Sequence, residues 1–170
     1  MDQNMINLLI ALLALLISFY CFYLVNQLRK DAVKKTGDDF NTKPLQLQAY
    51  ERLVMLTERI SLPNLISRSS QPGLGARDMQ ILLLEGIKQE YEYNATQQIY
   101  VSPVSWEAVR NLKEQNMLII NQVAGTLPPE ASGMDLNKRL LEFVMTQKKG
   151  ALHSVVLEAL NFEAKKILRP

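Results

Sequence analysis

Side chains able to bind a ligand or a protein partner gather between positions 90 and 98 of the sequence. They supply carboxylate, phenol and amide groups, and are Glu90, Tyr91, Tyr93, Asn94, Gln97 and Gln98. On a helix Glu90 and Asn94 share a face, as do Asn94 and Gln98, because side chains four positions apart are neighbours. The sequence therefore indicates a set of converging hydrogen-bonding groups, which we call the 90–98 patch.

The 90–98 patch has three interpretations. It is a recognition surface for a partner, a buried hydrogen-bond network that fixes helix register, or a ligand site completed by arginines such as Arg52, Arg59 or Arg110. The plainer alternative is an ordinary helix end with packed tyrosine rings and solvated amides. Because buried amide networks are the minority case, the composition favours this plainer interpretation.

Other kinds of chemistry lack the residues they need. The chain has one histidine, His153, and one cysteine, Cys21, so a single chain cannot assemble a zinc cluster, a disulfide framework or a Cys/His nucleophile pair. The Gly73-Leu-Gly75 turn lacks the third glycine and the Lys-Ser/Thr pair of phosphate-binding loops. We therefore expect a protein that is not an enzyme and that uses no metal and no cofactor.

The N-terminal region contains a long apolar run, Leu8 to Val25, in which Ser18 is the only conventional polar side chain among 18 residues. As a helix it would be roughly 27 Å long, close to the thickness of a bilayer core. A cleaved signal peptide would need a basic start, whereas residues 1–7 contain no Lys or Arg. A lipoprotein signal and a buried core helix fit less well, and the run predicts a single transmembrane helix in which Cys21 is a small buried side chain.

The residues that flank this run predict its orientation. Arg29, Lys30, Lys34 and Lys35 follow it, and no Lys or Arg precedes it. Since basic residues stay on the cytoplasmic side, we expect the N-terminus outside and the rest of the chain in the cytoplasm, at the cytoplasmic (inner) membrane. Residues 36–170 carry 15 basic and 15 acidic residues, so the excess positive charge lies beside the lipid headgroups and predicts no nucleic-acid surface.

The remainder of the chain shows helical periodicity and no sustained alternation, which predicts an all-α fold with a compact cytoplasmic bundle of about five helices. We expect an anchor with its basic flank at 1–35, a tether at 36–44 and a helical domain at 45–170. Pro63 is expected to end the first helix, with a loop at 67–75. The segment 76–99 is expected to be the longest helix, followed by one that Ser102 caps, one from Asp135 to Met145, and one over 152–168. Along the last of these we expect Val155, Val156, Leu160 and Ile167 to face inward.

Two stretches, LQAYERLVMLTERI with the following PNLISR, and QEYEYNATQQIYVSPVSWEAV, resemble an uncharacterised family of short single-pass membrane proteins of Bacteroidota. The resemblance extends to the order of parts: a span, a basic flank, a tether, the LQAYER helix and the Asn-x-Thr/Ser-Gln-Gln segment. After Pro129 it holds only in outline. It implies an all-helical cytoplasmic domain and brings no activity, cofactor or partner.

These observations favour a non-enzymatic, membrane-anchored interaction or scaffold module, since a span that confines a weak binding surface raises its effective concentration. The expected partners are the lipid bilayer and a protein, or a second copy of the chain. The alternative is a structural subunit of a larger membrane complex or homo-oligomer. A ligand sensor or enzyme built on the 90–98 patch is the third hypothesis.

Overall fold

The protein is all-helical over the residues that its computed structural model describes, 15–28, 42–146 and 152–168. The chain divides into two compact units, Met1–Asn41 and Thr42–Pro170. In the first unit, residues 15–28 are helical. Within the described ranges, no helix combines the length and the apolar character needed to cross a membrane. Residues 8–14 of the predicted span, and the basic flank Arg29, Lys30, Lys34 and Lys35, lie outside these ranges.

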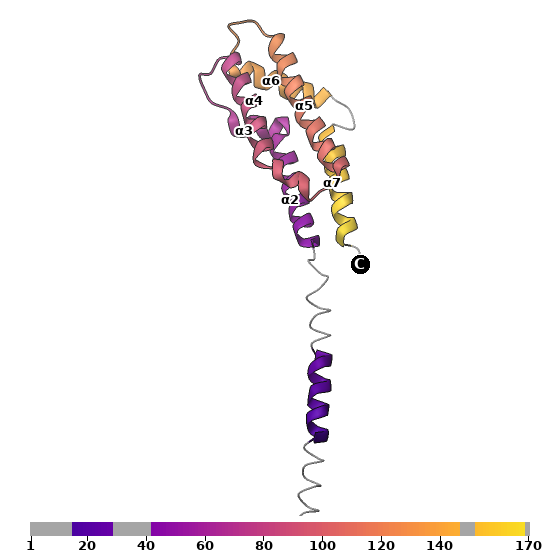
Figure 1. The fold of residues 1–170 in the computed structure, drawn as a ribbon. Helices are drawn as coiled ribbons and strands as arrows, with labels where there is room; N and C mark the ends of the chain where they lie inside the picture. Colours follow the sequence, from indigo (N-terminus) through magenta and orange to yellow (C-terminus); the bar gives the residue numbers. More distant parts are fainter. Residues whose placement is uncertain (1–14, 29–41, 147–151, 169–170) are drawn as a thin grey trace, which may run out of the picture. The chain divides into compact units, whose positions relative to one another are not determined.

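The second unit is a helical bundle with no strand in its described residues (Figure 1). Helix α2 begins and α7 ends at one end of the bundle, while α4 and α6 begin at the other (Figure 1). Its elements are α2 (Lys43–Ile60), α3 (Leu62–Ser69), α4 (Ala76–Tyr93), the 3-10 helix η1 (Ala95–Ile99), α5 (Pro103–Gly125), α6 (Gly133–Thr146) and α7 (Leu152–Leu168).

The first helix of the bundle has one apolar stripe along its length. Pro44 lies in the first turn of α2, where a missing N–H costs nothing. Ala49, Leu53, Leu56 and Ile60 recur at three- and four-residue steps and are all buried. This face packs against α7, α4 and α5, and so α2 forms one wall of the core.

Pro63 lies in the first turn of a second helix that begins at Leu62, and the loop predicted from residue 67 is wrong over its first three residues. Helix α2 ends at Ile60, Ser61 turns the chain with ψ 135°, and α3 then runs to Ser69. Proline is well tolerated in a first helical turn, and α3 buries an apolar face that includes Leu65 and Ile66. Packing of this face outweighs the loop-like composition of residues 67–69.

The segment 76–99 is not one continuous helix and is not the longest. Helix α4 has 18 residues and stops at Asn94, whose side-chain amide donates a 2.9 Å hydrogen bond to the carbonyl of Glu90. The chain continues as η1, and the longest described helix is α5 with 23 residues. Its predicted cap is confirmed, because the Ser102 hydroxyl accepts a 3.2 Å hydrogen bond from the Ser105 N–H.

The start of α6 is tied to the start of α4 by backbone hydrogen bonds. The N–H of Gly133 donates to the carbonyl of Leu74 at 2.8 Å, and the N–H of Ala76 donates to the carbonyl of Ala131 at 2.9 Å. A capping box completes this joint: the Ser132 hydroxyl accepts from the Asp135 N–H, and the Asp135 carboxylate accepts from the Ser132 N–H. The two N-termini are therefore fixed side by side.

The last helix has the predicted bounds, Leu152–Leu168. Of its expected inward residues, Val156 and Leu160 are fully buried and Ile167 is partly buried, whereas Val155 is exposed. Successive residues of a helix lie about 100° apart, so the burial of Val156 turns Val155 toward solvent. The core of the bundle thus draws on every α-helix from α2 to α7.

Candidate functional site

The structure brings part of the 90–98 patch together: Glu90, Tyr93 and Asn94 line one hollow with Arg52 and Arg59, two of the arginines considered from the sequence. Asn94 is buried at the end of α4, Tyr93 is strongly exposed beside it, and Gln97 and Gln98 belong to η1, where the Gln97 amide bonds only to the neighbouring Thr96 hydroxyl. The change from α4 to η1 at Asn94 breaks the continuous helix face on which the convergence was expected. Gln97 and Gln98 are therefore not part of this hollow.

Glu90 forms an ion-pair cluster with two arginines. Its carboxylate accepts hydrogen bonds from Arg59 Nε at 2.7 Å and from Arg68 Nη1 at 3.2 Å. Arg68 Nη2 also donates to the carbonyl of Arg59 at 2.7 Å. Burial by itself raises the pKa of the Glu90 carboxyl, but the hydrogen bonds and charges of Arg59 and Arg68 outweigh it and lower that pKa below its ordinary value. The cluster joins α4 to α2 and α3.

We expect the Glu90 cluster to make stability depend on acid pH. A lowered carboxyl pKa stabilises the folded state above the unfolded-state pKa, and this contribution is lost as pH falls below about 4.5 through the folded-state value. Because both arginines are largely solvated, the loss should be at most about 1 kcal/mol. Urea unfolding of the wild type and of Glu90→Gln between pH 3 and 7 measures it. Two parallel pH profiles would contradict the assignment.

Tyr91 has a structural role. Its ring lies 5.0 Å from the Trp106 ring, centroid to centroid, and the Lys113 ammonium lies 4.5 Å from its ring centroid. Burial raises the pKa of the Tyr91 phenol, although the charges of Lys113 and Arg110 act in the opposite direction. Tyr91 and Trp106 thus form an aromatic contact that packs α4 on α5.

A more organised arrangement lies where α2 turns into α3. The last carbonyls of α2 have no partners within the helix and are capped by side chains. The carbonyl of Glu58 accepts from the Ser61 hydroxyl at 2.8 Å and from the Asn64 amide at 3.0 Å. The carbonyl of Ile60 accepts from the buried amide of Asn116, on α5, at 2.8 Å. The turn is therefore held in place from two sides.

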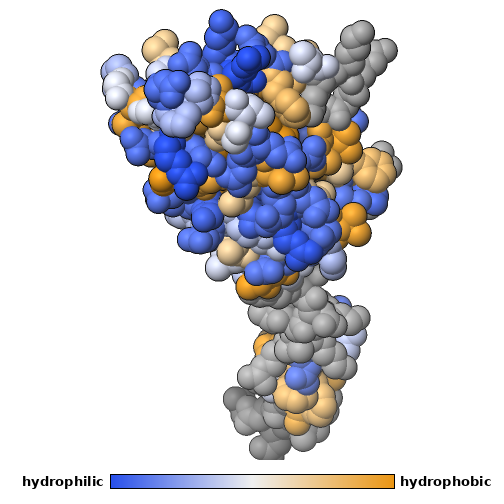
Figure 2. Space-filling model, turned by 90° about the horizontal axis from the view of Figure 1, so that it is seen from above, coloured by the Kyte–Doolittle hydropathy of each residue, from blue (hydrophilic) through white to orange (hydrophobic). Residues whose placement is uncertain are grey.

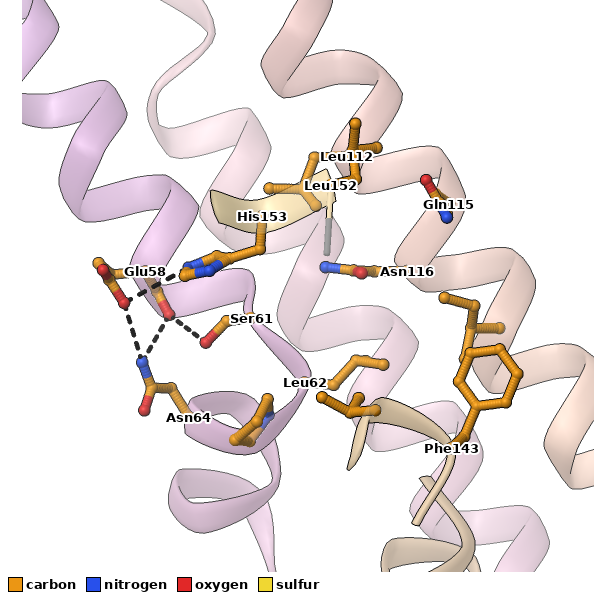
Figure 3. A pocket seen from close by; sticks show the side chains of 13 residues that line it. Glu58, Ser61, Leu62, Asn64, Leu112, Gln115, Asn116, Phe143, Leu152 and His153 are labelled. Atoms are coloured by element: carbon orange, nitrogen blue, oxygen red, sulfur yellow. Dashed lines mark hydrogen bonds and ion pairs between the residues drawn. The ribbon is translucent and has the colours of Figure 1, made fainter. Parts of the chain in front are cut away.

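This turn forms one side of an apolar cleft of about 280 Å³, which we call the junction cleft (Figure 3). Its walls come from the α2–α3 turn, the middle of α5, the end of α6 and the start of α7. The apolar lining consists of Leu62, Pro63, Leu112, Ile119, Phe143, Val144 and Leu152. The volume lies just below the usual range for small-molecule sites, so the cleft suits one or two apolar side chains better than a cofactor.

Polar groups gather at one side of the junction cleft, as Figure 3 shows. Nε2 of His153 lies 3.5 Å from an oxygen of the Glu58 carboxylate. This nitrogen is inaccessible to solvent and has no hydrogen-bond partner, while the rest of the imidazole is partly exposed. Gln115 and Asn116 line the cleft as well. The cleft therefore combines an apolar interior with groups that can hydrogen-bond to a peptide.

The junction cleft could not be predicted from the sequence, because its lining residues lie on five helices and span positions 58 to 153. His153 was interpreted alone, and no local pattern links it to Glu58. Within the described ranges, no group of three or more His, Cys, Asp or Glu side chains could hold a metal ion.

Comparison with known proteins gives one match. A model of a family of unknown function matches residues 3–167. Neither the curated proteins nor the solved structures provide a significant match.

Proposed function

We propose that this protein, which belongs to the DUF7935 family of unknown function, is a membrane-anchored, non-enzymatic interaction module. In this proposal the run Leu8–Val25 anchors the protein in the inner membrane of a bacterium, with the bundle in the cytoplasm. The apolar composition of that run and the basic residues that follow it support the anchor. The family assignment is compatible with this role and adds no activity to it.

The observation that carries the binding role is the junction cleft. It is a concave site beside the capped α2–α3 turn, with partly exposed apolar side chains such as Phe143 and Val144, and it places the partly exposed imidazole of His153, next to Glu58, at one side. An apolar side chain of a protein partner would fill the interior. A polar group of that partner's backbone or a neighbouring side chain would bond to His153 or Gln115.

Substitution at the wall of the cleft tests this role. Val144→Asp places a charge among the apolar lining residues, and we expect it to weaken partner binding by at least about tenfold, as for a central interface residue. Met145→Asp is the matched control, because Met145 is the next residue of α6, is 84% exposed and does not line the cleft.

The measurement is photo-crosslinking of the full-length protein in its native membranes, with benzoylphenylalanine at Gln115 and, for comparison, at the distant Met134. We expect a specific adduct from position 115 that Val144→Asp removes and Met145→Asp retains. An adduct unchanged in Val144→Asp would exclude the cleft as the binding site. Release of the protein from the membrane by alkaline carbonate would refute the anchor independently.

A further inference from the structure

Exposed apolar side chains gather at the end of the bundle where α2 begins and α7 ends. The set consists of Leu45, Ile99, Tyr100, Val104 and Leu168, which we call the end face. Ile99 and Val104 are 72% and 78% exposed, although Ile99 lies in η1 and Val104 lies in α5. A shallow hollow lined by Gln46, Ile99, Tyr100 and Ile167 shows that α2, the η1–α5 connection and α7 meet there.

The end face is held rigidly. The Tyr50 hydroxyl, from α2, accepts a 3.1 Å hydrogen bond from the N–H of Ser102, directly between η1 and α5. On α7, the Lys166 ammonium pairs with Glu163 at 2.7 Å and lies 4.5 Å from the centroid of the exposed Phe162 ring. Lys165 is exposed beside it. The face thus presents apolar side chains next to ammonium groups, the combination found in helices that lie in a membrane interface.

The opposite end of the bundle differs in character. Figure 2 views the bundle from the end where α4 and α6 begin, and this face is mainly hydrophilic, with apolar residues in small separate patches. Single exposed apolar residues such as Met134 are ordinary on protein surfaces. A rigid apolar cluster at one end is typical of a surface that binds a membrane or another protein.

The length of the segment that joins the bundle to the predicted anchor limits the distance between the end face and the bilayer. The bundle begins at Thr42, and 13 residues, 29–41, connect it to the helical residues 15–28. A fully extended chain covers at most about 3.5 Å per residue, so these residues allow a separation of at most roughly 45 Å. With the anchor proposed above, the end where α2 begins stays within this distance of the bilayer surface.

We propose that the end face docks onto the membrane, with Ile99, Tyr100 and Val104 among the lipid headgroups. This inference depends on the proposed membrane anchor and adds a lipid surface as the partner of the bundle itself. Tyrosine and aliphatic side chains favour this depth of the bilayer, while Lys165 and Lys166 meet anionic headgroups. The anchor makes docking intramolecular, so a small apolar area is sufficient.

Lipid quenching tests the docking in the full-length protein. The chain, with Cys21→Ser, is placed in nanodiscs of phosphatidylcholine and phosphatidylglycerol that contain a nitroxide-labelled lipid. An NBD fluorophore is attached at Val104→Cys or, as the comparison, at Met134→Cys. We expect strong quenching at 104 and little at 134. Ile99→Ser should lower the docked-to-undocked ratio at 104 by about tenfold, whereas the exposed Met145→Ser should leave it unchanged.

The other outcomes overturn the proposal in distinguishable ways. Equal weak quenching at 104 and 134, with the protein retained in the discs, would disprove docking and leave the anchor intact. A fluorescence blue shift at 104 without lipid quenching, seen only with several copies per disc, would show that the end face binds a second copy. Failure of the protein to enter the discs would refute the anchor and the docking together.

Discussion

Leu112→Ala is expected to lower the free energy of unfolding by about 3 kcal/mol, as for other buried leucines. Leu112 is 2% exposed and belongs to the hydrophobic core, yet it also lines the junction cleft. Truncation of its side chain would add a cavity beside the cleft, because the helices that form the walls are held by other contacts and do not move in to fill the space. The same change should therefore weaken partner binding, since the partner side chain would lose packing contacts.

Chemical denaturation of the full-length protein in detergent measures the first effect, with Leu118→Ala as control. Leu118 lies on the same helix and is exposed, so its truncation should change the unfolding free energy by less than about 0.5 kcal/mol. A loss below about 1 kcal/mol for Leu112→Ala would mean that the cleft closes over the deleted atoms. The cleft would then be a poor receptor for a partner side chain.

Asn116→Leu is expected to cost about 2 kcal/mol, although the two side chains have the same number and branching of non-hydrogen atoms. The Asn116 amide is the buried donor to the Ile60 carbonyl, where α2 ends. Leucine cannot donate this hydrogen bond, so the Ile60 carbonyl loses the side-chain partner that Asn116 provides. A buried acceptor without a partner costs its full desolvation free energy. The turn that shapes the junction cleft should loosen, so binding at the cleft should weaken as well.

The control for this prediction is Asn64→Ala, which removes an exposed amide from the carbonyl of Glu58 while the Ser61 hydroxyl still caps it. We expect a loss below about 0.5 kcal/mol there. Hydrogen exchange at the N–H of Leu65, which donates to the Ser61 carbonyl, reports loosening of the turn. Unchanged exchange and stability in Asn116→Leu would show that the turn does not depend on this bond.

The helices could be predicted wherever burial and local sequence agree. In α2, α5 and α7 the apolar residues recur with helical spacing, and Ser102 marks the start of α5 that the structure confirms, whereas α2 begins at Lys43, inside the predicted tether. The prediction failed at α3, because Pro63 and the serines around Arg68 favour a loop while burial of Leu65 favours a helix. Local composition does not report the neighbouring helix that covers such a face.

The candidate sites show the same limit more strongly. The 90–98 patch is contiguous in sequence, but its convergence assumed one helix through Asn94, where the chain changes from α4 to η1. Glu90 pairs with two arginines, Arg59 and Arg68, and Arg59 is among those considered from the sequence. The junction cleft depends on the meeting of Glu58 and His153, residues 95 positions apart whose approach only the packed bundle determines.

Helix α2 begins and α7 ends at the same end of the bundle (Figure 1). This geometry suits insertion of the whole domain into another protein. A chain that enters and leaves at neighbouring points can be spliced into a surface loop of another protein with short linkers, because the host's loop ends need not move apart. The described core residues all belong to this bundle, so a graft would carry its complete core with it. The host protein would then contain the junction cleft as well.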